Sequence, residues 1–382
     1  MYRFRLVLNK FLLPFIWLLL LGTCLIAPYF PEKVAQYYTN GLFRYGTTGL
    51  SSMFGRIPFA MGEFIYLIFI IILIINLIKY YNSLKIFNQK WQKLRYLLIR
   101  LSWLGIRLWI IFQLIWGLNY LQPGPIEAFQ LSVQPPQNAS IALEEINALT
   151  NTFIQALNQT KSELTQMGPQ NMDFEILCTL VESAYSKDLH LKKQSSVYFK
   201  NLKKAVFPGW GDYMGYLAFY QPMTGEAIVR ADLPAWTLPY TIAHEMAHQL
   251  GYASETEANF IAYIVATESG DPILRYSMLL QMFTYAQDAQ LLLIAGNKGF
   301  DAWEAQIKKN KSLLSPEVLK DRASIRDFFA ARSGKHIEAS SKLYDQFLKW
   351  NHQASGLASY QDVLKWVRAY QIKTGSSTSY SQ

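Results

Sequence analysis

One short segment of this sequence combines residue types that bind a metal and move a proton. It reads His244-Glu245-Met246-Ala247-His248, the pattern His-Glu-x-x-His. On a helix the two histidines lie on the same face, so both imidazoles can hold one metal ion. Glu245 projects beside them, where its carboxylate can take a proton from a metal-bound water. Zinc lowers the pKa of such a water to about 7, so the pattern predicts a zinc site that activates water.

The residues around this segment favour a helix that starts and stops close to it. Thr237 is suited to cap the N-terminus, Pro239 fits the first turn, and Gly251 can end the helix in the left-handed conformation. Upstream, residues 216–220 and 226–230 flank a Pro-Met-Thr-Gly turn, which indicates a hairpin. Such a hairpin could provide an edge strand on which an extended peptide lies antiparallel.

A catalytic zinc ion needs a third protein ligand and an open position for water. His190, His336 and His352 are isolated in the sequence, so an acidic residue is the better candidate for the third ligand. If the chain reverses after the first helix and a second helix begins at Ser254, its first turn lies beside the two histidines.

That turn contains Glu255 and Glu257, which point about 200° apart around a helix. Ser254 and Glu257 form an S-x-x-E capping box, which gives Glu257 a structural role. Glu255 and Asn259 share a face, so Glu255 can bind the metal while Asn259 hydrogen-bonds a ligand histidine. Glu255 is therefore the predicted third ligand, and Glu257 is the alternative.

The N-terminal third of the chain predicts a membrane anchor over residues 1–121. Three apolar runs, at about 11–31, 57–78 and 101–121, reach the length of about 20 residues that crosses a bilayer. The anchor carries 13 Lys and Arg against two acidic residues, whereas residues 122–382 carry 23 against 25. The basic excess belongs to the anchor, which points to a lipid bilayer and not to nucleic acid as the partner.

Lys and Arg are distributed unequally around these spans. Nine lie in the N-terminal tail and the second loop, and three lie in the first loop. The positive-inside rule therefore predicts a multi-pass protein of the cell membrane with a cytoplasmic N-terminus. Three crossings place the rest of the chain on the outer side.

The remaining residues predict one domain beyond the membrane. A Pro-rich linker at 122–140 leads to a mostly α, α+β domain at 141–374, followed by a Ser/Gly-rich disordered tail at 375–382. The two cysteines, Cys24 and Cys178, exclude a disulfide-stapled fold and a thiolate-rich zinc site. The sequence carries no signal of oligomeric state.

The motif resembles that of the gluzincin metallopeptidases, in which a Glu at the start of a second helix follows His-Glu-x-x-His. Residues 255–259 are similar to their Glu-x-x-Ala-Asp/Asn pattern, which implies Glu255 as the zinc ligand, although only six residues separate it from His248. The metzincin pattern does not fit, since Ser254 stands where it needs His or Asp. The whole chain resembles the bacterial membrane family known as domain of unknown function 3810, which implies a membrane zinc peptidase.

These features favour a membrane-anchored, zinc-dependent endopeptidase that acts on a peptide or protein substrate at the outer side. Such an enzyme needs a hydrogen-bond donor for the oxyanion, for which Tyr360 is the predicted catalytic residue and Tyr344 the alternative. Two other functions stay open. One is a zinc-binding sensor without proteolysis, which the intact Glu245 argues against. The other is a zinc amidase acting on a non-peptide or cell-wall substrate.

The charge distribution generates a prediction about topology. A reporter enzyme that works only outside the cytoplasm should be active when fused after Gln382 and inactive when fused near Gln89, because the basic second loop stays inside. Reporter activity in intact cells measures this. The reverse pattern would contradict the predicted sidedness.

Overall fold

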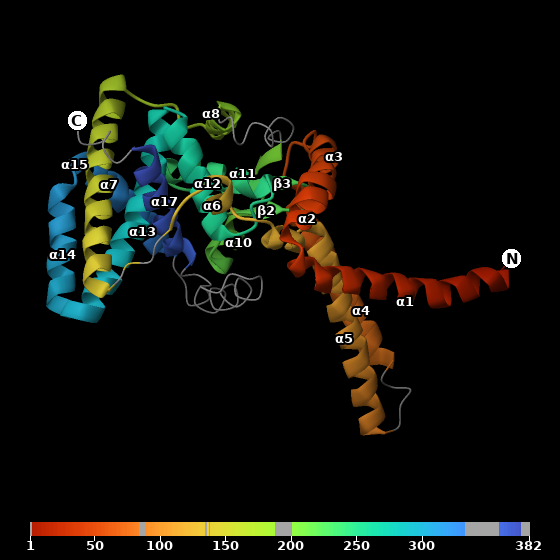
Figure 1. Cartoon of the computed structure of the whole chain (residues 1–382). Helices are drawn as coiled ribbons and strands as arrows, with labels where there is room; N and C mark the ends of the chain where they lie inside the picture. Colours follow the sequence, from red (N-terminus) through yellow and green to blue (C-terminus); the bar gives the residue numbers. More distant parts are fainter. Residues whose placement is uncertain are drawn as a thin grey trace.

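The computed structural model describes residues 2–83, 89–133, 136, 138–187, 201–332 and 359–375, and for residues 2–11 and 359–361 it describes the backbone alone. Most of these residues are helical, and one small sheet lies among the helices (Figure 1). This confirms the predicted mostly helical α+β class at the level of its secondary structure.

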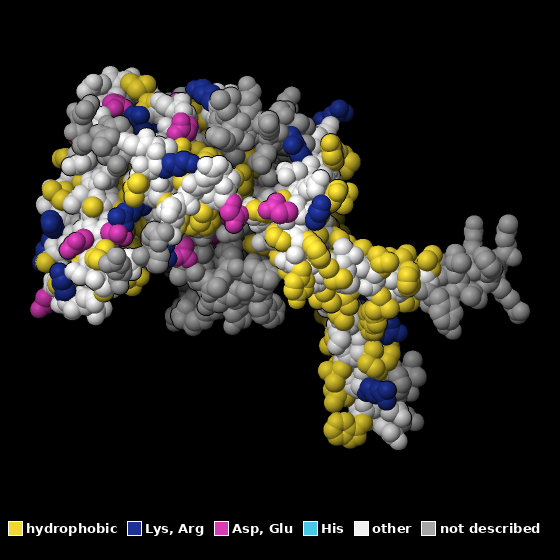
Figure 2. All heavy atoms as spheres, viewed as in Figure 1, with side chains coloured by type: hydrophobic (Ala, Val, Ile, Leu, Met, Phe, Trp, Pro, Cys, Tyr) yellow, Lys and Arg dark blue, Asp and Glu magenta, His cyan; other side chains and the backbone are white. Residues whose placement is uncertain are grey.

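Three helices are long and apolar enough to cross a membrane: α1 (Tyr2–Ile26), α4 (Met61–Ser83) and α5 (Lys90–Ile115). A helix suits such a segment because it satisfies every backbone polar group internally. Figure 2 shows hydrophobic side chains gathered over these helices, while charged side chains are scattered over the remaining visible face. In Figure 1, α1 runs at a wide angle to α4 and α5.

The bounds of these helices differ from those of the apolar runs. α4 begins at Met61, because the residue before Pro58 disfavours helical geometry and residues 55–60 turn instead. α5 begins at Lys90, since its first turns are polar but still helical. It ends at Ile115 and gives way to a short 3-10 helix, η4 (Gly117–Leu121).

The first loop of the predicted anchor folds onto the C-terminal part of the chain, a contact that no local pattern of residues predicts. It forms η1 (Ala27–Tyr29), α2 (Pro31–Lys33), the π-helix η2 (Val34–Phe43) and α3 (Arg44–Phe54). The hydroxyl of Ser51 donates to the carbonyl of Gly225 over 3.4 Å. Buried side chains of this segment, of residues 116–118, of the sheet and of the turn before α12 share one apolar cluster: Val34, Tyr38, Phe43, Trp116, Leu118, Tyr220 and Ala253.

Helices build the core of the C-terminal part. They are α6 (Pro125–Ala128), α7 (Ala139–Met167), α8 (Phe174–Lys187), α10 (Pro208–Met214), η6 (Ala235–Thr237), α11 (Leu238–Gln249), α12 (Glu255–Glu268), α13 (Pro272–Lys298), α14 (Phe300–Leu313), α15 (Pro316–Arg332) and α17 (Ser359–Thr374).

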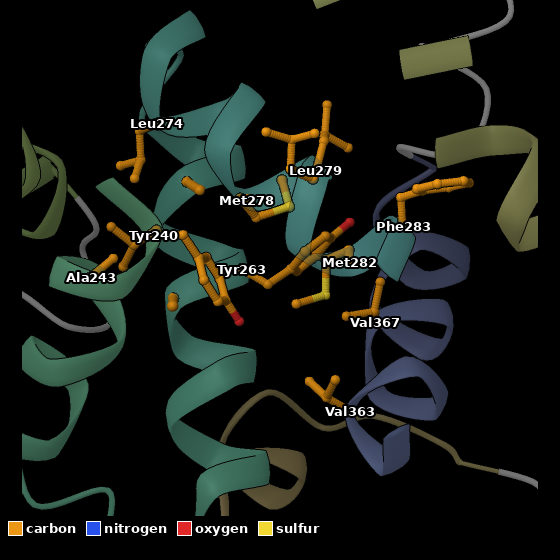
Figure 3. Packing of buried hydrophobic residues seen from close by; sticks show 14 of the residues in the cluster. Tyr240, Ala243, Tyr263, Leu274, Met278, Leu279, Met282, Phe283, Val363 and Val367 are labelled. Carbon is orange, nitrogen blue, oxygen red and sulfur yellow. The ribbon is translucent and has the colours of Figure 1, made fainter. Parts of the chain in front are cut away.

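The helices α11 and α12 lie at the centre of this core. Nearly all residues of α12 from Glu255 to Ala266 are buried, whatever their polarity. Figure 3 shows how Tyr240 of α11, Tyr263 of α12, Met282 of α13 and Val367 of α17 meet in one cluster. Burial of side chains of this size stabilises the fold by roughly 1.5–3 kcal/mol each, which holds α11 and α12 in fixed positions.

A three-stranded sheet packs on α11 in the order β1-β3-β2. The predicted hairpin is present as β2 (Ala218–Gln221) and β3 (Glu226–Val229), which pair antiparallel. The third strand, β1 (Leu202–Lys204), pairs parallel with β3 and was not predicted. Its two lysines do not read as a buried strand, but the Lys203 ammonium donates to the carbonyls of Gly55 and Ile57.

The carboxylate of Glu226 attaches the first turn of α4 to this sheet. Glu226 of β3 is fully buried and accepts hydrogen bonds from the backbone N–H groups of Met61 (3.1 Å) and Gly62 (2.6 Å). The hydroxyl of Thr224 also donates to Glu226, over 2.9 Å. The free N–H groups of a helix start favour a negative charge, so Glu226 joins a membrane helix to the domain.

Removal of this carboxylate should destabilise the whole chain. Glu226→Ala leaves the N–H groups of Met61 and Gly62 without their acceptor, at a cost of about 3 kcal/mol. The melting temperature of the full chain in detergent, followed by Trp fluorescence, should fall by roughly 5–10 °C. Glu304→Ala, which removes an exposed pair with Lys308, is the control and should change it little. Equal melting temperatures for both variants would contradict the role given to Glu226.

Candidate metal centre

The helix α11 presents both histidines of the motif on one face. It runs from Leu238 to Gln249 with Pro239 in its first turn, as expected. The expectation that the Thr237 side chain caps the helix is wrong. The preceding 3-10 helix η6 gives Thr237 a helical backbone (φ −90°, ψ −23°) in place of the extended one that suits a side-chain cap, and its hydroxyl donates to the carbonyl of Pro234 over 2.7 Å.

The chain reverses between α11 and α12 through Gly251, whose φ is +95°. The N–H of Tyr252 donates back to the carbonyl of Ala247 over 3.2 Å and closes the turn. The next helix begins at Glu255, with Ser254 as its N-cap. Both the left-handed residue at Gly251 and the second helix after Ser254 agree with the sequence prediction.

This reversal places the first turn of α12 beside the two histidines. The Nε2 atoms of His244 and His248 are 3.2 Å apart, and an oxygen of Glu255 lies 3.2 Å from His244 Nε2 and the other 3.9 Å from His248 Nε2. One ligand atom from each of the three residues falls within 4.8 Å of the others. Two imidazoles and a carboxylate at such spacing match the donors of a zinc site.

The opposite nitrogen of each ring is held by an acceptor. His244 Nδ1 lies 3.0 Å from Asn259 Oδ1, and His248 Nδ1 lies 2.6 Å from the carbonyl of Tyr252. Each acceptor favours the tautomer with the proton on Nδ1, which leaves the Nε2 lone pair free for a metal. Asn259 therefore lies where its predicted role beside a ligand histidine requires.

Other side chains fix these contacts and were not identified from the sequence. The hydroxyl of Tyr240 donates to Asn259 Oδ1 over 2.9 Å, which sets the direction of that amide. The ring of Trp116 packs edge-on against His248 with centroids 5.9 Å apart. Trp116 reaches the site only because a distant segment folds against α11. Tyr240 lies on α11 itself, four residues before His244, so the helical spacing alone places it on the histidine face.

Burial and charge set the protonation of the ligand residues. Burial and the neighbouring His244 lower the pKa of His248 to about 4, so its imidazole is neutral at pH 7. Burial also lowers the pKa of His244, but the carboxylates of Glu255 and Glu245 and the contact with Asn259 together outweigh this effect and raise it. The Glu255 charge is therefore balanced within the site by an imidazolium or by a bound cation.

Glu245, the acidic residue of the His-Glu-x-x-His motif, is not one of the three converging donors. Its side chain is 5% exposed, and its Oε2 accepts no hydrogen bond from the residues that the structure describes. Burial raises its pKa to about 8, against the lowering effect of His244. A buried carboxyl group with a free oxygen and a pKa near neutrality is suited to accept and release a proton.

Glu257 lies outside this cluster. Its carboxylate accepts a hydrogen bond from the backbone N–H of Ser254, which is one half of the predicted capping box. The other half is missing, since the Ser254 side chain does not cap the helix. Burial raises the pKa of Glu257 to about 8, and Glu127 adds to the effect.

The other predicted site residues fall outside what the structure describes. This applies to the side chain of Tyr360, to Tyr344, to His190, His336 and His352, and to the tail after residue 375. The role of Tyr360 as oxyanion donor stays a prediction.

A family model described as Protein of unknown function (DUF3810) matches residues 38–368. The chain belongs to this family. The matched range includes α4, α5 and every residue of the candidate metal centre, and it confirms the family resemblance seen in the sequence. No curated protein and no solved structure matches the chain.

The positions of the two glutamates in this DUF3810 member lead to a prediction about metal content. Glu255→Ala should lose zinc affinity sharply, because it removes one of three converging donors. Glu257→Ala should retain zinc and melt slightly lower, since it removes only a helix-terminal hydrogen bond of about 1 kcal/mol. Zinc per chain, measured by mass spectrometry of the purified full chain, distinguishes the two. Loss of zinc in Glu257→Ala alone would contradict the assignment of Glu255.

Proposed function

We propose that the chain is a membrane-anchored, zinc-dependent endopeptidase that hydrolyses peptide bonds on the outer side of the membrane. The observation that carries this proposal is the convergence of His244, His248 and Glu255 beside the buried carboxyl group of Glu245. The resemblance of the motif to that of gluzincin peptidases points in the same direction. A sensor that only binds zinc would not need a proton acceptor in this position.

The residues divide into those that would hold zinc and those that would handle protons. Nε2 of His244, Nε2 of His248 and a Glu255 oxygen would hold the ion, with the two rings oriented by Asn259 and the Tyr252 carbonyl. When bound, zinc would polarise the carbonyl group and make a water molecule more acidic.

Glu245 supplies the proton transfer. In the hydrolysis, the water oxygen bonds to the peptide carbon while Glu245 accepts a water proton. The C–N bond then breaks, and Glu245 passes that proton to the leaving amine, so the carboxylate ends as it began. Its pKa of about 8 and its free oxygen suit both half-steps.

The small sheet supports a peptide as the substrate. β2 is an edge strand among the described strands, and its neighbour β3 packs on α11. An extended peptide can add to such an edge through backbone hydrogen bonds, which fits many sequences and needs no special side chain.

The fold also supports the proposed sidedness. The start of α4 and the end of α5 both adjoin the C-terminal domain, while the end of α4 and the start of α5, whose sequences contain Lys79, Lys90 and Lys93, extend away from it (Figure 1). The Lys-rich loop and the metal centre would therefore face opposite sides of a membrane.

Substitution of Glu245 separates metal binding from catalysis. Glu245→Gln should retain roughly one zinc per chain but lose activity by 10²-fold or more, because an amide cannot accept the proton. His244→Ala should lose the metal as well. The measurement compares outer-side peptide termini in cells with the wild type and with Glu245→Gln, together with the zinc content of each purified chain. Full activity of Glu245→Gln against a genuine substrate would contradict the mechanism.

A further inference from the structure

The metal centre is attached directly to the membrane helices, without a flexible connection. Trp116, which packs on His248, follows the last residue of α5. A few residues later, the side chain of Gln122 donates to the carbonyl of Gly251 over 2.7 Å. Consecutive Cα atoms are about 3.8 Å apart, and the rings of Trp116 and His248 are 5.9 Å apart. The ligand His248 therefore lies on the order of 10 Å from Ile115, the last apolar residue of α5.

The start of α4 packs on the small sheet, including its edge strand β2. In addition to the Glu226 contacts, the ring of Tyr66 lies 5.9 Å from that of Phe219 on the edge strand β2. A Cβ atom at Gly62 would clash with the side chain of Gln221, so the first turn of α4 packs directly on the side chains of β2. A peptide on β2 would therefore lie next to the first turns of α4.

A patch of exposed apolar side chains adjoins the same turn of α4. It comprises Val206, Phe207, Trp210, Tyr213 and Met214, each between 39% and 61% exposed. The ring of Phe207 lies 5.6 Å from that of Phe64, and the N–H groups of Val206 and Phe207 donate to Glu63. Figure 1 shows α10, which carries Trp210, Tyr213 and Met214, on the side toward which α4 and α5 extend.

The composition and position of this patch fit the surface of a bilayer. Trp and Tyr concentrate at membrane–water interfaces, where one part of the ring is apolar and another polar. The patch is continuous with α4, which is long and apolar enough to span the membrane. The lipid surface is thus its occupant, and the domain lies against the bilayer with its metal centre near the headgroups.

This position restricts the substrate. We propose that the metal centre acts at the membrane surface on a polypeptide tethered to the same membrane, and cuts it within about ten residues of its exit from the lipid. An extended chain covers about 3.3 Å per residue, so three to six residues bridge a gap on the order of 10–20 Å. The bilayer hinders a folded soluble protein from approaching β2. The inference rests on the proposed peptidase function and adds no chemical step to it.

The first test measures the position of the domain without any use of activity. Met214→Cys on α10 and Met167→Cys at the end of α7 each receive the same environment-sensitive fluorophore in the full chain in nanodiscs. Both methionines are exposed, by 51% and 61%, and the natural Cys24 and Cys178 are buried. Nitroxide-labelled lipids should quench the label at 214 at least threefold more strongly than the label at 167. Equal quenching at the two positions would overturn the proposal.

The second test uses a substrate whose sequence does not vary with distance from the membrane. A single model transmembrane helix carries an outer tail of four identical copies of one mixed ten-residue sequence, and is placed in nanodiscs with the zinc-loaded full chain. The copy next to the membrane should be cut at least tenfold faster than the fourth copy, as mapped by mass spectrometry. Equal rates in all copies would overturn the inference while the peptidase function stands.

The matched controls separate the two levels of the proposal. The same tail without the helix should be cut at least tenfold more slowly at equal concentration, and Glu245→Gln should cut neither form. If several different tail sequences were all left intact by the wild type, the peptidase function would fall and the substrate class with it. Quenching of the label at 214 would still report where the domain lies.

Discussion

Two buried helices must reverse direction within a few residues so that one ligand atom from α12 meets two from α11. The reversal runs through Gly251, at a φ of +95° that costs other residues conformational energy. A Cβ atom here would also lie 3.1 Å from a methyl group of Thr39 and 3.3 Å from the ring of Phe43. The turn thus places Glu255 opposite the two histidines. The backbone carbonyl of Tyr252, which also belongs to the turn, orients the His248 ring.

Burial makes this arrangement specific. Polar groups in a low-dielectric interior are costly unless they find partners, so each ring nitrogen and carboxylate of the centre has few acceptable orientations. Asn259 shows the effect, since its Oδ1 accepts from Tyr240 while it also holds His244 Nδ1. Among the described residues of the site, Glu245 Oε2 and Asn259 Nδ2 are buried without a hydrogen-bond partner. A free buried acceptor is an energetic cost, and the proton-transfer role proposed for Glu245 would account for it at Oε2.

The membrane part of the chain belongs to the architecture of the site. Glu226 joins the start of α4 to the sheet, and Trp116 joins the end of α5 to His248. The first loop contributes Val34, Tyr38 and Phe43 to the apolar cluster that also contains Trp116 and Tyr220. The C-terminal domain therefore cannot rotate freely about a linker. In the proposed membrane arrangement, these contacts would hold the candidate metal centre at a constant height above the bilayer, in contrast to one on a flexible stalk.

The sequence by itself determined the features that depend on nearby residues. Helical spacing put His244 and His248 on one face, the special backbone of Gly251 located the turn, and the apolar runs identified three helices suited to a membrane. The relation of Glu255 to Asn259 is also local, which is why the predicted arrangement agrees with the structure. The choice between Glu255 and Glu257 followed from the 100° step of a helix.

Only the tertiary structure decided which distant segments complete the site. β1 pairs with β3 although its lysines hide the strand pattern, since the ammonium of Lys203 finds carbonyl acceptors far away in the chain. The local Thr237 cap was wrong because a 3-10 helix leads directly into α11 and leaves Thr237 with a helical backbone. Trp116 contacts the metal centre through long-range packing. Such contacts depend on the sum of many weak apolar interactions, which no local pattern of residue types encodes.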